Sequence, residues 1–140
     1  MIVLDTNVVS ETMRRIPNAV VVRWIDHQPW NELYLCTPVL AEIGYGIARL
    51  EDSRRKRTLL LSYRQIIDED FEDRVLPFDT IAADAYGELV AMLESAGKSI
   101  DTIDAMIAAI VLSNGATLAT RNTAHFTHTG VDLIDPFGTD

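Results

Sequence analysis

Three acidic residues that are far apart in the chain, Asp5, Glu42 and Asp104, are candidates for a common site. Asp5 stands at the end of an expected strand, where open α/β sheets bind ligands, and the other two lie within helical stripes that otherwise indicate core. Asp5 directly follows the apolar run Ile2–Leu4, which is short enough for a buried strand. Glu42 and Asp104 lie at helical spacing from apolar neighbours, so each points into an otherwise apolar stripe. Acids that break a local pattern in this way often mark functional sites.

Converging carboxylates need a cation or shared protons. Two carboxylates about 4 Å apart repel by about 4 kcal/mol at an effective dielectric of 20, and burial adds a further penalty to the charged form. Oxygen ligands without sulfur suit Mg²⁺ or Mn²⁺, which keep several waters and accept phosphate oxygens. A site of that kind can activate water and stabilise the departing oxygen of a phosphodiester.

Each acid also has a purely structural interpretation. Asp5 could cap the helix that follows it. Glu42 could pair with Arg49, and Asp104 could face the dipole of its own helix with Asp101 as the cap. We interpret Asp101 mainly as a cap, and we consider the three anomalies together more informative than any one of them.

Apolar periodicity and turn residues predict the elements that would position the acids. Thr6-Asn7 can cap the first helix, and Thr37-Pro38 opens another with Thr at the cap. We expect helices over 6–15, 18–27, 37–50, 52–67, 80–95 and 101–113, and strands near 2–4, 33–35, 75–76, 116–120 and 131–134. Alternation of strands and helices indicates one three-layer α/β/α domain over residues 1–140, with a central, mainly parallel sheet.

Composition limits the class of protein. The chain has 140 residues, 48% of them hydrophobic, and no run approaches the roughly 20 apolar residues of a membrane span. Asp5 interrupts the first apolar run too early for a secretory signal. The single Cys36 excludes an internal disulfide and a cysteine-rich zinc site. We expect a cytoplasmic protein, and the formal charge of −9 argues against general duplex binding but not against a nuclease.

The sequence resembles the PIN-domain ribonucleases, particularly the VapC-type toxins of bacterial toxin–antitoxin systems. Four matching segments occur in the family's order, namely Val3–Asn7, Leu40–Glu42, Asp104–Ala109 and Ala119–Asn122. Asn7–Glu11 and Leu76–Asp79 also look similar to the FitB-like subgroup. No single segment is specific, but all four in order over nearly the whole chain are a strong signal.

The resemblance implies a metal-dependent endoribonuclease in which Asp5 and Asp104 bind Mg²⁺ or Mn²⁺ directly. Glu42 would complete the metal shell or position the attacking water. Asn122 stands where other members place a fourth acid, which puts a full second metal site in doubt. Thr6 and Thr120 match family positions that can contact metal-bound water or phosphate, with helix capping and strand packing as equal alternatives. A homodimer and inhibition by a cognate antitoxin, in a toxin–antitoxin hetero-oligomer, are also implied.

Several other residues are candidate ligands. Arg54–Arg57 could contact RNA phosphates, although a solvated helix face is the simpler interpretation. Arg121 could neutralise phosphate beside the site, or pair at the surface. His125 and His128 are spaced for two metal ligands, but the absence of a nearby thiolate favours ordinary loop histidines.

Two other functions remain open at this point. A receiver-like phosphoacceptor domain also uses acids at strand ends, but Asp5 has no acidic neighbour, and Lys98 precedes a helix rather than following a late strand. A catalytically silent PIN-like domain would keep the fold only as a docking surface for RNA or protein.

Overall fold

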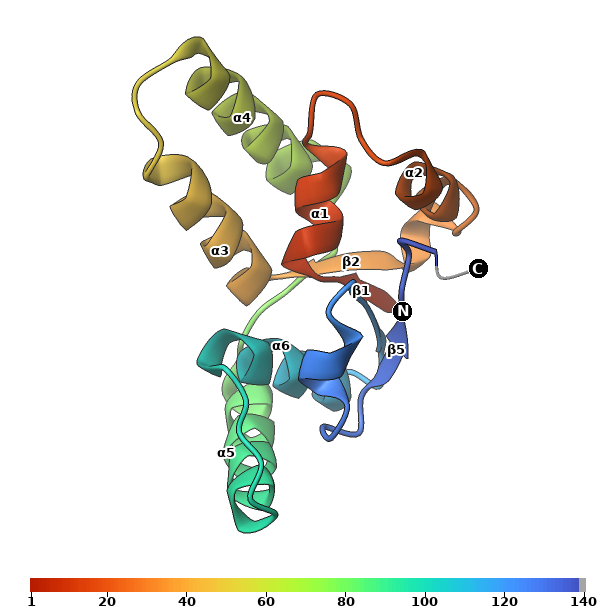
Figure 1. Ribbon diagram of the computed structural model, residues 1–140, viewed down its shortest axis with the longest axis vertical. Helices are drawn as coiled ribbons and strands as arrows, with labels where there is room; N and C mark the ends of the chain where they lie inside the picture. Colours follow the sequence, from red (N-terminus) through yellow and green to blue (C-terminus); the bar gives the residue numbers. More distant parts are fainter. Residues whose placement is uncertain (139–140) are drawn as a thin grey trace.

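The computed structural model describes residues 1–138, which form a five-stranded parallel sheet (Figure 1). Its strands lie in the order β3-β2-β1-β4-β5, and every neighbouring pair is parallel. The bounds are β1 (Ile2–Leu4), β2 (Leu33–Cys36), β3 (Val75–Leu76), β4 (Thr117–Ala119) and β5 (Asp132–Ile134). The predicted parallel sheet is confirmed.

Helices cover both faces of this sheet, so the expected three layers are present. In Figure 1, α1, α2 and the α3–α4 pair lie on one side of the strands, and α5 and α6 lie on the other. The bounds are α1 (Thr6–Thr12), α2 (Ala19–Asp26), α3 (Thr37–Ala48), α4 (Arg54–Gln65), α5 (Thr80–Ser95) and α6 (Thr102–Ser113). Within residues 1–138, no helix has the length and apolar character needed to cross a membrane.

Two helix starts differ from the prediction. The N-cap of α1 is Asp5, whose side chain accepts a hydrogen bond from the Thr6 N–H, so the predicted Thr6-Asn7 cap is wrong. The N-cap of α3 is Cys36, and Thr37 is already helical. The Thr37 hydroxyl instead accepts a hydrogen bond from the backbone N–H of Phe78 at 3.1 Å, which ties the end of β3 to the start of α3.

The predicted helix over 52–67 ends differently because a π-helical turn, Ile66–Asp70, follows α4. The Phe71 N–H donates to the carbonyl of Ile66 at 2.9 Å, and the buried Phe71 ring packs 5.0 Å from the ring of Trp30. Arg74 donates to the backbone carbonyl of Asp70 at 2.8 Å. The packing of Phe71 and the hydrogen bond of Arg74 therefore accompany a change from α-helix to π-helix, which the apolar periodicity of this segment does not predict.

The core lies along β1, β4 and α6. Fully buried side chains on these elements include Val3, Leu118, Ile107, Ile110 and Val111. Strands that are buried on both faces carry continuous apolar runs rather than an alternating pattern. This explains why such short strands are recognisable in the sequence.

The strand order defines where a ligand can enter the sheet. From β1 the chain builds β2 and β3 on one side, and then crosses to β4 and β5 on the other. Beyond the carboxyl ends of β1 and β4 the connections diverge, which opens a crevice at that edge of an open α/β sheet. The acids should be sought there.

Removal of core contacts beside this crevice should destabilise the protein. We expect Leu118→Ala to lower the free energy of unfolding by about 2–5 kcal/mol, because the truncation leaves a cavity in a fully buried strand. Urea denaturation measures the difference. The matched control is Leu61→Ala on α4, where the side chain is 73% exposed, with an expected change within about 0.5 kcal/mol. Equal effects would contradict this placement of the core.

Candidate functional site

Asp5 lies at the carboxyl end of β1 and is only 4% exposed. Its Oδ1 accepts a hydrogen bond from the Thr6 N–H at 2.8 Å. Its Oδ2 accepts from the Thr120 hydroxyl at 2.7 Å and from the Asn7 side-chain amide at 3.3 Å. Asp5 therefore caps α1 through Oδ1, as its structural interpretation predicted. Its Oδ2 is directed away from the helix, toward Thr120 and Asn7.

Thr120 follows β4 and is fully buried, so it connects the two strands at the crevice. Its hydroxyl donates to Asp5 and accepts from the Asn7 side chain at 3.3 Å and from the Asn122 N–H at 3.0 Å. Oδ1 of the Asn7 side chain accepts a hydrogen bond from the backbone N–H of Arg121 at 3.0 Å. These hydrogen bonds fix the Asp5 carboxylate and the segment after β4 relative to each other.

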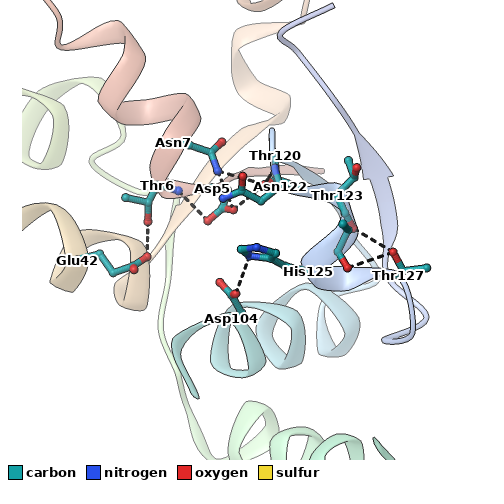
Figure 2. Close-up of polar contacts among 11 residues, drawn as sticks. Asp5, Thr6, Asn7, Glu42, Asp104, Thr120, Asn122, Thr123, His125 and Thr127 are labelled. Carbon is teal, nitrogen blue, oxygen red and sulfur yellow. Dashed lines mark hydrogen bonds and ion pairs between the residues drawn. The ribbon is translucent and has the colours of Figure 1, made fainter. Parts of the chain in front are cut away.

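Glu42 approaches from α3. Its Oε1 accepts a hydrogen bond from the Thr6 hydroxyl at 2.5 Å (Figure 2). The alternative pairing with Arg49 is wrong, because the Arg49 guanidinium lies over the ring of Tyr45, 5.6 Å from its centre. Glu42 is therefore oriented by a hydroxyl that belongs to the first turn of α1.

Asp104 approaches from the first turn of α6, on the opposite side of the sheet from Glu42. Its Oδ2 lies 3.2 Å from Nδ1 of His125. Asp101 occupies the N-cap position of α6, as predicted, but its side chain makes no capping hydrogen bond. Asp101 instead faces the same pocket as Asp104.

These side chains line one pocket of about 490 Å³, which we call the acid pocket. Figure 2 shows that Asp5, Glu42 and Asp104 reach it from three separate elements. The full lining is Asp5, Thr6, Asn7, Glu42, Asp101, Asp104, Asn122 and His125. The three acids that the sequence singled out, together with Thr6 and Asn122, are thus brought together, while Thr120 lies behind Asp5.

Arg121 and the basic run face elsewhere. The Arg121 guanidinium lies 4.6 Å from the ring centre of Phe137, and its side chain lines a neighbouring hollow rather than the acid pocket. Arg55 lines that same hollow. Lys56 instead donates to the carbonyls of Ala48 and Leu50 at 3.1 and 3.0 Å. Within the basic run at the start of α4, Arg55 therefore lines a hollow, whereas Lys56 binds the end of the preceding helix.

Burial makes the negative charge of the acid pocket costly. Burial raises the pKa of Asp5, although hydrogen bonds from Thr120, Thr6 and Asn7 oppose the rise. The pKa of Asp104 is also raised, first by burial and then by repulsion from Asp5, against the attraction of His125. Burial raises the pKa of the Cys36 thiol to about 12, so the only cysteine is not a nucleophile.

The donor set fits a hard divalent cation, because the carboxylates of Asp5, Glu42, Asp101 and Asp104 share one pocket, and burial disfavours the charges of Asp5 and Asp104 in it. Among residues 1–138, however, no three histidine, cysteine or acidic side chains are close enough, as they lie, to hold a metal ion. The carboxylates are oriented by hydroxyl, amide and imidazole groups instead. The pocket therefore contains the carboxylate ligands that a hard divalent cation prefers, but these side chains are too far apart, as they lie, to coordinate one ion together.

Sequence reasoning gives no site role to three residues of the pocket, Asn7, Asp101 and His125. Asn7 is indicated as a possible cap and within two segments of the resemblance, yet its side chain connects Asp5, Thr120 and Arg121. The interpretation of His125 as an ordinary loop histidine is wrong, because it lies on the short 3₁₀ helix Thr123–Phe126 and contacts Asp104. Its signal is its position three residues after Asn122, within one helical turn of a predicted site residue.

The fold and this acid-lined crevice have counterparts among known proteins. Residues 2–131 match the PIN domain family. The chain is 45% identical to "Plasmid stability protein StbB" of Pseudomonas syringae pv. tomato, covering 98% of this chain and 99% of that protein. It is 37% identical to "VapC ribonuclease Y4jK" of Sinorhizobium fredii, covering 98% of each.

A solved structure gives the same result for the fold. "Crystal Structure of FitAcB from Neisseria gonorrhoeae" superposes with a TM-score of 0.91 and 36% identity, covering 98% of this chain and 99% of that one. The chain therefore belongs to the PIN-domain family, and within it to the VapC-type ribonuclease toxins of toxin–antitoxin systems. The predicted resemblance, fold and function class are confirmed.

The electrostatics of Asp104 predict a pH-dependent gain in stability on its neutralisation. Because its pKa in the folded state is above the ordinary value of 3.8, the folded protein binds more protons than the unfolded chain between these values. Stability from this residue is therefore lost as the pH rises through the folded-state pKa. We expect Asp104→Asn, measured without divalent ions, to gain stability relative to the original protein as the pH rises from about 4 to about 7.

Chemical denaturation at each pH measures this difference. The control is Glu88→Gln on α5, an exposed carboxylate whose removal changes the formal charge equally and should alter the free energy of unfolding by no more than about 0.5 kcal/mol. A gap between Asp104→Asn and the original protein that shrinks with rising pH would contradict the assigned burial cost.

Proposed function

We propose that this VapC-type toxin is a metal-dependent endoribonuclease that hydrolyses RNA phosphodiester bonds in the acid pocket. The observation that supports it most directly is the meeting of carboxylates from β1, α3 and α6 in one pocket. Asp5 also caps α1, but the raised pKa values of Asp5 and Asp104 indicate that the charges of these two carboxylates are unfavourable where they lie. A bound cation would relieve that cost.

Asp5 and Asp104 would hold the metal, because they line the same pocket and repel one another, so that a cation between them would lower the cost of both charges. Glu42, held by the Thr6 hydroxyl, would complete the ligand set or orient the attacking water. Asn122 can offer a carbonyl oxygen from the end of β4. A bound Mg²⁺ or Mn²⁺ would lower the pKa of the attacking water and neutralise charge on the phosphodiester.

The fixed hydrogen bonds around Asp5 would keep the site preorganised. Thr120 and Asn7 hold its Oδ2, and the Thr6 N–H holds its Oδ1, so the carboxylate does not reorganise when substrate enters. Thr6 and Thr120 would thereby act as positioning residues rather than substrate contacts. Preorganised groups lower the barrier because their orientation is already set in the free protein.

RNA would approach along hollows on either side of the acid pocket. The hollow that Arg121 lines shares Thr6, Asn7 and Glu42 with the pocket, measures about 560 Å³, and also contains Arg14 and Arg55. Guanidinium groups at that edge would bind phosphates next to the cleaved bond. Arg121 would then bind a phosphate beside the acid pocket rather than within it.

A cognate antitoxin and a second copy of the chain complete the proposal, and we place the protein in the cytoplasm. The formal charge of −9 favours a basic antitoxin segment, and an arginine of that partner entering the acid pocket would compete with the metal. Exposed apolar side chains, including Tyr45, Leu61 and Ile81, supply surface for such interfaces. A homodimer, alone or within a toxin–antitoxin complex, is the expected assembly.

Of the two alternative functions, the structure excludes the receiver-like domain and leaves the catalytically silent PIN-like module as a candidate. A receiver-like domain is wrong, because such sheets have the strand order 2-1-3-4-5 whereas this one has β3-β2-β1-β4-β5. A catalytically silent PIN-like module remains the second candidate, because no three histidine, cysteine or acidic side chains among residues 1–138 are close enough, as they lie, to hold a metal ion. It predicts RNA or protein binding that is insensitive to chelation.

Cleavage of RNA should depend on both the metal and the acids. We expect a fluorescent RNA to be cut with Mg²⁺ or Mn²⁺, EDTA to abolish cutting, and Asp5→Asn or Asp104→Asn to reduce the rate by roughly 100-fold or more, since even supporting residues of metal sites are worth about 10–100-fold. Asp84→Asn, an exposed acid on α5, is the matched control. Undiminished cleavage by both site variants, or in EDTA, would refute the metal assignment.

Expression in a bacterial host should arrest growth if RNA cleavage is the toxic activity. We expect induction of the original chain to stop the increase in culture density, and induction of Asp5→Asn at equal protein level to leave growth normal. Immunoblotting checks the level of each protein. Equal arrest by both proteins would indicate that toxicity does not depend on the acid pocket.

A further inference from the structure

A second hollow, of about 340 Å³, adjoins the acid pocket on the side of α5 and α6. The two share Asp101, Asp104 and His125 as a common wall, so a ligand that occupies the acid pocket can continue directly into this space. Its remaining lining is Leu93, Lys98, Ser99, Ile100, Ala124, His128 and Thr129. None of the roles described above uses these residues.

The cationic groups of this hollow stand out against the acidic chain. Residues 75–140 contain only two lysine or arginine residues, Lys98 and Arg121, and Arg121 packs on Phe137. Lys98 is exposed and takes part in none of the ion pairs found among residues 1–138. Two of the protein's three histidines, His125 and His128, also lie here. One of the two cations of this half of the chain, Lys98, therefore lies beside the acids together with two histidines.

The backbone that carries Lys98 is held in place by the end of α5. Gly97 has a φ of +70°, a conformation that favours glycine, and its N–H donates to the carbonyl of Glu94 at 3.0 Å. The Lys98 N–H donates to the carbonyl of Leu93 at 2.8 Å, which completes a Schellman-type helix end. The ammonium group therefore extends from an ordered position at the edge of the hollow.

The segment that carries His128 is also fixed. Thr129 is 5% exposed, its hydroxyl donates to the carbonyl of Phe126 at 2.6 Å, and its N–H donates to the same carbonyl at 3.1 Å. His125 lies one helical turn before His128 and contacts Asp104. His125 therefore lines both the acid pocket and the hollow, and His128 lines the hollow alone. Hydrogen bonds of Thr129 to the backbone hold the segment that carries them.

The hollow combines these polar groups with apolar surface from Leu93 and Ile100. Lysine is a phosphate-binding point charge, and an imidazole offers at least one N–H donor in either protonation state. Apolar side chains contact the faces of bases and riboses. The volume of about 340 Å³ lies within the roughly 300–1,000 Å³ typical of ligand clefts. Cation, donor and apolar surface at this scale match one nucleotide.

We propose that this hollow is a subsite for the RNA nucleotide next to the cleaved bond. Lys98 and His128 contact its flanking phosphate, and Leu93 and Ile100 contact its base or ribose. His125 stands at the boundary, between the nucleotide and the acids. The proposal rests on the proposed ribonuclease function, because it assigns the path of the substrate on one side of the acid pocket.

Steady-state cleavage kinetics of the double variant Lys98→Gln, His128→Gln test the proposal. We expect KM for a short single-stranded RNA to rise by about 10-fold and kcat to change less than about 2-fold, because phosphate contacts that position substrate weaken binding across sequences when they are removed. The slope of log KM against log salt should fall in magnitude by about 0.7 for each phosphate that the variant no longer neutralises. Arg23→Gln, an exposed cation on α2, is the matched control, with KM and salt slope unchanged.

A binding measurement separates this proposal from the function on which it rests. Fluorescence anisotropy with labelled RNA uses Asp5→Asn with and without the two substitutions, so it needs no cleavage. Weaker binding of the triple variant, with an unchanged thermal midpoint, supports the subsite. If the original protein cleaves RNA but KM, salt slope and anisotropy are unchanged by the double substitution, the subsite is wrong. If it does not cleave RNA at all, the proposed function fails independently.

Discussion

The hydrogen bond between the Thr120 hydroxyl and Oδ2 of Asp5, 2.7 Å long, joins the ends of β1 and β4 at the point where the sheet opens. It keeps a carboxylate ionisable at a position that is 4% exposed, against the burial that raises its pKa. The Asn7 amide and the Thr6 N–H also hold that carboxylate. The other two acids of the predicted site are connected to this buried carboxylate, since Glu42 accepts a hydrogen bond from Thr6, the residue after Asp5, and the charge of Asp5 repels that of Asp104.

Most of the fold could be predicted because parallel strands and their crossover helices leave strong periodic signals. The runs Ile2–Leu4 and Thr117–Ala119 are buried on both faces, and the acids on α3 and α6 stand out as exceptions within apolar stripes. The convergence of Asp5, Glu42 and Asp104 follows from the strand order, which the sequence analysis does not predict beyond a central, mainly parallel sheet. Boundaries are less predictable, since the π-helical turn after α4 depends on Phe71 packing against Trp30 from another part of the chain.

The rest of the site could not be predicted from local pattern. His125 has no apolar stripe to interrupt, and its position three residues after Asn122 is a weak signal beside its tertiary contact with Asp104. Arg121 follows Thr120 in sequence, but its guanidinium lies on Phe137, because an extended segment sends successive side chains in different directions. Asn7 looks like an ordinary cap residue, and its bonding to Thr120 and Arg121 joins partners 113 and 114 positions away in the chain.

The raised pKa values of Asp5 and Asp104 have a thermodynamic consequence for the lifetime of the protein. Any positively charged occupant that neutralises the acid pocket binds only the folded state, and so shifts the folding equilibrium by mass action. The protein without such an occupant is therefore the most susceptible to local opening and proteolysis, and the occupied one is the longest lived. Burial and mutual repulsion of these carboxylates lower the free energy of unfolding of the protein without a cation. A cation that binds in the acid pocket removes this cost, and the same free energy then contributes to its binding affinity.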